Sequence, residues 1–298
     1  MTIAACYVSR EGVVLGADST STFEFGTPDQ KKNHYFNYSQ KLFEIGEKST
    51  LGIVAWGLGA ASSNVSYRTM TARVADTFAA RPVASVLDVA NRWIEMLWAE
   101  YQTSFANQIK RAQELIWKDA SRTPDEDAEL KKLEDFIAGF CIGGYWPDAK
   151  RTPCAYEIIF DPRTATPVPR PIPLYRASFW GVPQMMGRLT RGIDVDLLRD
   201  IYMSDHWTGT ADELLAVLAP YNLHTPNLPI REAIDFIHAS IYSTVKGLKF
   251  SRLDQVCGGP IEIAVITADR RFRWVRHKHM DAAIQEQEGD IWRKIEEP

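Results

Sequence analysis

The sequence has little net charge, no long hydrophobic run and no basic leader segment. Its formal net charge is −4, from 34 basic and 38 acidic side chains, which gives no general attraction to nucleic acid or to an anionic membrane. The most apolar run, residues 51–62, is shorter than the roughly 20 residues that a membrane-spanning helix needs. The first residues lack the basic segment and apolar stretch of a secretion signal. We therefore expect a cytoplasmic protein without a nucleic-acid or membrane partner.

Cysteines are also few. The four of them, Cys6, Cys141, Cys154 and Cys257, are scattered, with no C-x-x-C pair and no histidine at zinc-finger spacing. This pattern favours neither a zinc site nor a disulfide framework, so we predict buried, reduced thiols. A G-x-S-x-G motif and a Walker-type phosphate loop are absent too, and residues 57–62 lack the last glycine of a dinucleotide-binding motif. The sequence therefore indicates no metal ion and no cofactor.

The overall composition is that of a folded globular protein. Of the 298 residues, 45% are hydrophobic and 24% are charged. These values exclude a disordered or collagen-like chain. The length allows one large domain or two of average size. We predict a single domain over residues 1–298, because layered folds often reach this length without dividing.

Short apolar segments joined by tight turns predict four β-hairpins. Their strand pairs are residues 3–8 with 13–17, 41–45 with 51–56, 140–145 with 155–160, and 261–267 with 272–276. Gly12, at the end of the first turn, suits the left-handed position of a short hairpin loop. Hairpins build antiparallel sheets, which excludes a doubly wound parallel fold.

Between the hairpins, apolar residues recur at helical spacing. Residues 83–118 carry an apolar stripe that predicts one long amphipathic helix or two. Further helices are expected over residues 186–201, 211–218 and 230–245. We interpret the acidic segment 123–135 as a solvated loop with helical ends, and the five prolines of residues 162–173 as a surface connection. Helices that alternate with hairpins predict helical layers over the sheet faces.

The start of the chain places a nucleophile and a base in one residue. Removal of Met1, usual ahead of a residue as small as threonine, gives Thr2 a free α-amine beside its hydroxyl. An α-amine has a pKa of about 7.7–8.0, close to working pH, where a general base is most effective. Threonine activated by its own amine is a known nucleophilic pairing. The register of the first hairpin places Thr2 opposite Ser19 and diagonal to Asp18.

The second hairpin brings a lysine and a glycine to the same region. Its register pairs Lys41 with Ala55 and leaves Lys41 within diagonal reach of Gly57. A partly desolvated lysine beside a carboxylate lowers the proton affinity of a neighbouring hydroxyl. A glycine lets a backbone N–H approach a developing oxyanion. Thr2, Asp18, Lys41 and Gly57 are therefore candidate catalytic residues.

Structural interpretations of the same residues stay open. Asp18 and Lys41 can form a structural ion pair, and Thr2 can be an ordinary strand start. Near the end of the sequence, the alternating histidines of residues 277–279 are interpreted as part of a solvated strand end, because no acidic or cysteine partner is placed beside them. Cys6 lies in an apolar strand and is interpreted as core filling.

The candidate residues belong to longer motifs. These motifs are residues 2–19, Lys41–Ile45, Gly57–Leu58, Arg231–Asp235 and Asp254–Thr267. Together they resemble the opening strands, lysine strand, oxyanion donor, final helix and closing strand of the proteasome β-subunit family of N-terminal nucleophile hydrolases, including its bacterial homologues. The resemblance covers about residues 2–66, 137–189 and 229–276. It leaves out a helical insertion at about 90–135 and a C-terminal extension at about 277–298.

This resemblance implies an α+β fold of four layers, αββα, in which two antiparallel sheets lie between helical layers. It also implies that Asp254 and Cys257 orient the terminal amine. Cys257 stands where the family usually has serine, and a thiol is the weaker hydrogen-bond partner. Residues 179–181 fall near the family's Gly-Ser-Gly loop, so Trp180 replaces the serine of that loop.

The implied activity is that of a threonine peptidase that hydrolyses peptides or unfolded proteins inside a self-compartmentalised ring or helical homo-oligomer. Whether an ATP-driven unfoldase docks on it is left open. One alternative keeps the fold but acts on small molecules as an amidase or acylase, which a closed, deep pocket at Thr2 would favour. A second alternative is a non-catalytic assembly subunit, in keeping with Trp180 and Cys257.

Overall fold

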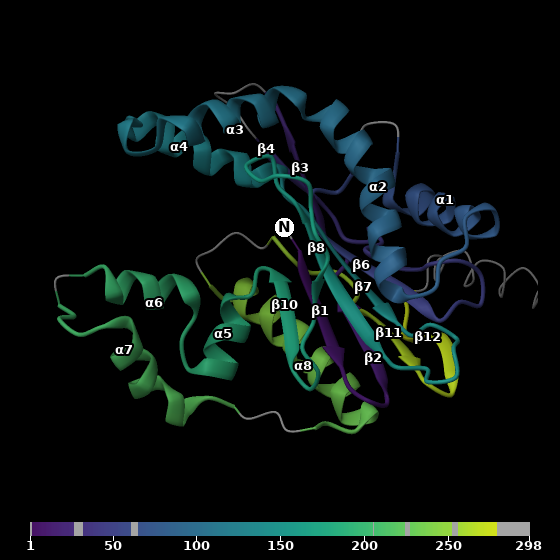
Figure 1. The fold of residues 1–298 in the computed structure, drawn as a ribbon. Helices are drawn as coiled ribbons and strands as arrows, with labels where there is room; N and C mark the ends of the chain where they lie inside the picture. The colour runs from purple at the N-terminus through teal and green to yellow at the C-terminus, as the bar shows by residue number, and fades with distance from the viewer. Residues whose placement is uncertain are drawn as a thin grey trace, which may run out of the picture.

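Two five-stranded antiparallel sheets form the centre of the molecule, and helices cover their outer faces (Figure 1). The structure, a computed structural model, describes residues 2–26, 32–60, 65–204, 206–223, 227–251 and 256–278. Hydrophobic clusters lie between the sheets and between each sheet and its helices. The four-layer αββα arrangement expected from the sequence is therefore confirmed.

The first sheet has the strand order β10-β1-β2-β11-β12. Its strands are β1 (Ile3–Val8), β2 (Gly12–Ala17), β10 (Ala177–Gly181), β11 (Glu262–Thr267) and β12 (Arg270–Arg276). β1 and β2 are buried along their whole length, because one face packs on the second sheet and the other on a helix. Burial on both faces explains why these strands are nearly continuous apolar runs in the sequence.

The second sheet has the strand order β5-β6-β7-β8-β9. Its strands are β5 (Leu42–Glu44), β6 (Leu51–Gly57), β7 (Ala138–Gly144), β8 (Cys154–Phe160) and β9 (Arg170–Pro171). The short β9 lies at the edge and comes from the proline-rich connection. Proline is tolerated there because an edge strand has an unpaired side.

The helices pack in layers on both sides of the sheets. α1 (Tyr67–Ala80) and α2 (Val86–Ser104) cover the outer face of the second sheet, and α8 (Ile230–Lys249) covers that of the first. The others are α3 (Ala106–Lys118), α4 (Pro124–Lys132), α5 (Gln184–Arg191), α6 (Val195–Tyr202) and α7 (Ala211–Leu218). Within the described part of the chain, none of them combines the length and apolar character that a membrane span requires.

Three hydrophobic clusters hold the layers together. The central one lies between the sheets and joins residues such as Leu15 and Val54. A second joins the first sheet to α8 through residues such as Ile3 and Ile237, and a third surrounds Trp93 of α2. Full burial of one such side chain contributes about 1.5–3 kcal/mol. Stacking of the layers is therefore the main source of stability for the strands and helices that form them.

The hairpins have the register that the sequence predicts. Ala4 pairs with Ala17 in the first, and in the second the N of Ala55 donates to the carbonyl oxygen of Lys41 at 2.8 Å. β7 pairs with β8, and β11 with β12, as expected. The stripe over residues 83–118 forms two helices, α2 and α3.

Two helical predictions need correction, and the first concerns residues 186–201. This segment forms α5 and α6 rather than one continuous helix. Gly192 follows α5 with a left-handed φ of +76°, and its N–H donates to the carbonyl of Arg188. A glycine in this conformation ends a helix, because residues with a Cβ rarely adopt it.

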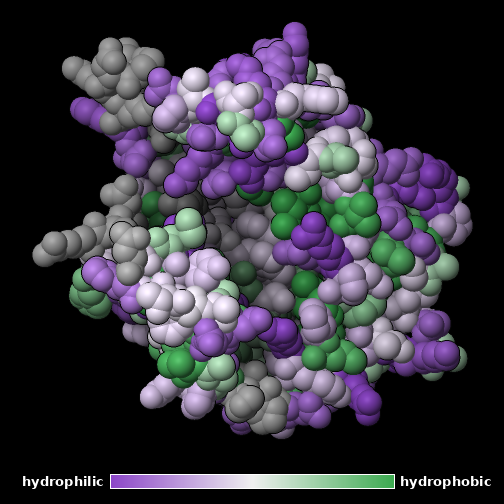
Figure 2. All heavy atoms as spheres, turned by 60° about the vertical axis from the view of Figure 1, so that its left-hand side comes forward, coloured by the Kyte–Doolittle hydropathy of each residue, from purple (hydrophilic) through white to green (hydrophobic). Residues whose placement is uncertain are grey.

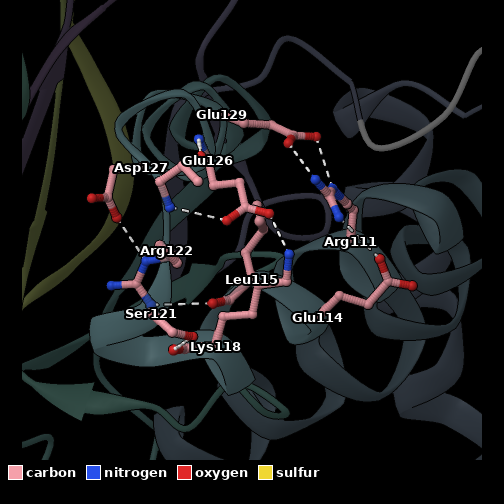
Figure 3. A network of polar contacts seen from close by, with 10 residues as sticks. Arg111, Glu114, Leu115, Lys118, Ser121, Arg122, Glu126, Asp127 and Glu129 are labelled. Carbon is pink, nitrogen blue, oxygen red and sulfur yellow. Dashed lines mark hydrogen bonds and ion pairs between the residues drawn. The ribbon is translucent and has the colours of Figure 1, made fainter.

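The second correction is α4, which forms where the sequence predicts a solvated loop with helical ends over residues 123–135. The Thr123 hydroxyl accepts from the N of Glu126, whose carboxylate accepts from the N of Thr123. Acidic residues in the first turn and lysines in the last complement the helix dipole. Charged contacts to α3, such as Arg111 to Glu129 at 2.6 Å, connect the two helices (Figure 3). The high charge of this segment therefore belongs to a salt-bridged helix.

A further hairpin, β3 (Ser21–Phe25) with β4 (Lys32–Phe36), was not expected. It pairs with neither main sheet. Phe23, Phe25 and Phe36 are each about half exposed, and the rings of Phe23 and Phe36 lie 5.3 Å apart, edge to face. We call this segment the aromatic ribbon. The sequence signal is weak here because charged and polar residues interrupt the strand pattern.

Candidate active site

Thr2 lies at the start of β1, between β2 and β10. Its carbonyl oxygen accepts a hydrogen bond from the N of Val182 at 2.9 Å. The next residue, Ile3, donates from N to Oδ1 of Asp18 at 3.1 Å, and its carbonyl oxygen accepts from the N of Asp18. Gly181 allows this close packing, because a Cβ there would lie 1.7 Å from the Thr2 carbonyl oxygen. The start of β1 is thus held from both sides, and Thr2 is only 4% exposed.

Asp18 follows β2 directly and accepts four hydrogen bonds. Its Oδ1 accepts from Ile3 and from Nζ of Lys41, the latter at 2.6 Å. Its Oδ2 accepts from the N of Thr20 at 3.2 Å and from the N of Gly258 at 2.8 Å. The carboxylate is fully buried, and these donors compensate for its removal from water.

Lys41 precedes β5 of the second sheet and is almost fully buried. Burial lowers the pKa of its ammonium group, and the attraction of the Asp18 carboxylate opposes that effect. The short contact with Asp18 therefore favours the charged form of Lys41 in an environment that otherwise disfavours charge. A lysine in this state is a strong donor toward any oxygen that gains negative charge nearby.

Thr2 and Lys41 line the same cavity, which has a volume of about 530 Å³. Ser21 and Phe23 of the aromatic ribbon contribute one part of its wall, and Gly57 at the end of β6 contributes another. The volume falls in the range of ligand-binding pockets. The face seen in Figure 2 is hollowed near its centre, below a mostly hydrophilic upper part.

Gly57 lines this cavity and has a structural requirement of its own. Its φ is +79°, and a Cβ at this position would lie 2.1 Å from the carbonyl oxygen of Ile137. The same carbonyl accepts a hydrogen bond from the N of Leu58 at 2.8 Å. Glycine is therefore required where the chain leaves β6, independently of any role in binding an oxyanion.

The segment that leads into β11 also reaches the site. Cys257 is fully buried, and its burial, with the nearby Asp18 carboxylate, raises the pKa of the thiol to about 12. Gly258 donates to Asp18, and its carbonyl oxygen accepts from the N of Ser19 at 3.0 Å. The predicted site residue Asp254 lies outside the described residues.

Trp180, which the resemblance places near a catalytic loop, lies close to the end of a strand. It lies in β10, pairs with Ala4, and is 9% exposed between the two sheets. Its ring stacks on Trp56 with centroids 4.4 Å apart, and its Nε1 donates to Oε1 of Glu157. Because Trp56 lines the cavity, Trp180 supports the cavity wall from behind. Because β10 ends at Gly181, residues 179–181 lie next to the turn that leads into α5, and the comparison of Trp180 with a loop serine stays a prediction.

Lys278 and Glu262 form a second buried ion pair near the site, which sequence reasoning missed. Nζ of Lys278 donates to Oε2 of Glu262 at 2.9 Å, to the carbonyl oxygen of Ser39 at 2.8 Å and to Oγ of Ser19 at 3.2 Å. The solvated strand end predicted here is therefore wrong for Lys278, and His279 lies outside the described residues. No local pattern predicts this pair, because the folding of β11 against β12 creates it.

No family model and no curated protein matches this sequence. Similar solved structures include "Anbu (ancestral beta-subunit) from Yersinia bercovieri", with 12% identity and a TM-score of 0.47, covering 100% of this chain and 98% of that chain. An Anbu (Gly-1) mutant from Hyphomicrobium sp. strain MC1 has the same identity and TM-score and covers 100% and 99%. Values at this level do not show a family, so the roles of the residues rest on their own geometry.

Proposed function

We propose that this chain is an N-terminal threonine hydrolase that cleaves peptide bonds. Removal of Met1 would free Thr2, which then supplies both the nucleophilic hydroxyl and the amine base. The observation that carries the proposal is the meeting of Thr2 and Lys41 at one cavity, with Asp18 bonded to Lys41 and to the start of β1. A purely structural ion pair needs no cavity beside the first residues of the chain.

In the proposed reaction, Oγ of Thr2 attacks the carbonyl carbon of the substrate amide, and its proton passes through water to the Thr2 amine. Lys41, held by Asp18, stabilises the charge on Oγ, and the N–H of Gly57 donates to the oxyanion. Collapse of the intermediate breaks the C–N bond, and the leaving amine takes the proton from the Thr2 ammonium. Water then hydrolyses the remaining ester on Thr2 by the same steps.

Cys257 and Asp254 are proposed to orient the Thr2 amine, as the resemblance implies. The hydrogen bond from the N of Gly258 to Asp18 supports this assignment, because Gly258 directly follows Cys257 and this contact holds the segment beside the Asp18–Lys41 pair. With its pKa raised to about 12, the Cys257 thiol would act as a neutral hydrogen-bonding group and not as a nucleophile.

Chemical labelling tests the nucleophile. Intact-mass analysis first shows whether Met1 is removed. Wild type, Thr2→Ala and Thr2→Ser are then treated with a β-lactone that esterifies N-terminal hydroxyl residues. We expect one adduct, mapped to residue 2, in wild type and Thr2→Ser, and none in Thr2→Ala. Retained Met1, or an equal adduct on Thr2→Ala, would contradict the proposal.

Peptides or unfolded proteins are the proposed substrates. Part of the cavity wall is strand, since Ser21 of β3 lines it, and β3 pairs with β4 on one side only, which leaves an edge suited to an extended chain. Fluorogenic peptides and small acylated amines compared on the same enzyme test this choice. Thr2-dependent turnover of small amides alone would point to an amidase. If the protein shows no turnover and no labelling, that result would indicate a non-catalytic assembly subunit.

We also propose that copies of this chain assemble into a homo-oligomer. The aromatic ribbon supports this part of the proposal, because Phe23, Phe25 and Phe36 are 49%, 56% and 48% exposed. A two-stranded ribbon is only marginally stable alone, and aromatic residues are enriched in protein interfaces. Light scattering coupled to size exclusion should show an oligomer for wild type and a smaller species for Phe25→Ser/Phe36→Ser. A monomeric wild type would contradict it.

A further inference from the structure

The second buried ion pair, Lys278 with Glu262, lies at the end of the first sheet where Asp18 follows β2. Nζ of Lys278 donates to Oε2 of Glu262 at 2.9 Å, and neither residue is more than 4% exposed. Lys278 follows β12, whereas Glu262 begins β11 and pairs with Ala17, the last residue of β2. Glu262 therefore faces the residue that directly precedes Asp18.

The Lys278 ammonium also donates hydrogen bonds to the two segments that carry Asp18 and Lys41. It donates to Oγ of Ser19 at 3.2 Å and to the carbonyl oxygen of Ser39 at 2.8 Å. Ser19 follows Asp18 directly, and Ser39 lies two positions before Lys41. An ammonium has three donors, and with Glu262 all three are used.

These contacts reinforce a backbone link between the same segments. The N of Ser39 donates to the carbonyl oxygen of Ser19 at 2.9 Å. Lys278 thus contacts both sides of the junction at which the first sheet meets the second. Lys278 therefore contacts both segments that carry the Asp18–Lys41 pair.

We propose that Lys278 is a positioning residue for the Thr2 site. Through Ser19 and Ser39 it fixes the spacing of the segments that carry the ion pair. Together with Glu262 it also sets the electrostatic environment of the Lys41 ammonium. This inference rests on the proposed function, since it assigns Lys278 to the same reaction.

The charges around Lys41 predict a sign for this effect. Lys41 faces Asp18, Cys257 and, with a smaller influence, Lys278, whose positive charge lowers the pKa of Lys41. Removing that positive charge raises the pKa of Lys41, and the remaining Glu262 carboxylate acts in the same direction. Removing the Glu262 charge leaves the Lys278 cation unbalanced and lowers the pKa of Lys41.

Two other titratable groups, His277 and Arg68, lie near this pair. Nδ1 of His277 lies 2.7 Å from Oε1 of Glu262, without the alignment of a hydrogen bond. The pKa of Lys278 is lowered by burial and raised by Glu262, and Arg68 lowers it further. Both His277 and Arg68 stay unchanged in the variants that test the proposal.

The test is the pH dependence of β-lactone acylation at Thr2, followed by intact mass. The variants are Lys278→Met, Glu262→Gln and the charge-balanced double variant Lys278→Met/Glu262→Gln. If Lys41 acts as a cation, its deprotonation sets the alkaline limb of the profile. We expect this limb to move up by about 0.5 pH unit or more in Lys278→Met and down in Glu262→Gln. In the double variant it should lie close to wild type.

Controls separate this proposal from loss of folding and from failure of the proposed function. Lys249→Met, at an exposed position at the end of α8, should leave the profile unchanged. Near-ultraviolet circular dichroism reports folding, and if Lys278→Met does not fold, Glu262→Gln and the double variant still decide the sign. Failure to acylate Thr2 in wild type would overturn the proposed function itself. With wild type acylated, unchanged limbs, or shifts of one sign in both single variants, would overturn the role of Lys278.

Discussion

Nζ of Lys41 lies 2.6 Å from Oδ1 of Asp18, and this contact joins the two sheets of the molecule. Asp18 directly follows β2 of the first sheet, whereas Lys41 directly precedes β5 of the second. Both side chains are buried, so the pair is shielded from salt and solvent. The geometry of the site therefore depends on how the sheets stack, and changes to the pair should affect stability and chemistry together.

The first prediction concerns the charge of Asp18. Asp18→Asn keeps the shape of the side chain but leaves the buried Lys41 cation without its anion. We expect a loss of about 3–5 kcal/mol in the free energy of unfolding, measured by urea denaturation, together with loss of Thr2 acylation. In the neutral pair Asp18→Asn/Lys41→Met the loss of stability should be smaller than in Asp18→Asn. Equal losses would mean that the buried charge is not the cause.

A second prediction separates two glycines that line the same cavity. Gly57→Ala forces a Cβ to within 2.1 Å of the Ile137 carbonyl oxygen at a φ of +79°. It should cost about 2 kcal/mol or more in thermal or chemical unfolding. At Gly59 a Cβ would meet nothing within 4 Å, so Gly59→Ala should stay within about 0.5 kcal/mol of wild type. Similar effects for both would refute the packing explanation.

A third prediction follows from the raised pKa of the Cys257 thiol. The pKa is about 12 in the folded protein, above its usual value of 9.0, because burial and Asp18 disfavour the thiolate. Between these pH values the unfolded chain loses its proton while the folded protein keeps it, so this group lowers the free energy of unfolding as the pH rises. Cys257→Ser should reduce that alkaline loss of stability.

The same shift predicts slow alkylation of Cys257. The thiolate is the form that attacks iodoacetamide and displaces iodide, and it is scarce at mildly alkaline pH when the pKa is about 12. Peptide mapping should find Cys257 unmodified in the native protein and carbamidomethylated after unfolding in urea. Rapid modification of the native protein would show that this thiol is neither buried nor perturbed.

A fourth prediction tests whether Trp180 is a structural support. Trp180→Phe removes the bond from Nε1 to Glu157 but keeps an aromatic ring on Trp56, so a loss of about 1–3 kcal/mol is expected. Trp180→Ala also leaves a cavity between the sheets and should cost about 3–5 kcal/mol. Trp117 is 88% exposed, and Trp117→Phe serves as the matched control with little expected change. Equal stability of all three variants would contradict this role.

Much of the fold follows from the sequence because its signals are local. A strand has a period of two residues and a tight turn fixes which residues face each other, so the pairing of Ala4 with Ala17 can be predicted by counting. α4 is harder to predict although Thr123 and Glu126 form a capping box, because an acidic segment that contains proline is also typical of a solvated loop. The aromatic ribbon is harder to predict because β4 is exposed along its whole length and does not alternate apolar with polar residues.

Part of the candidate site could likewise be predicted from the sequence, and part could not. Local sequence determined which residues could supply a hydroxyl, a carboxylate and an ammonium, and hairpin register placed Asp18 beside the start of β1. Only the tertiary structure decided that Trp180 packs on Trp56 and that Lys278 reaches Ser19 across 259 positions of chain. Contacts of this kind depend on how whole sheets stack and close, and hydrophobic burial drives that stacking without encoding which polar groups it brings together.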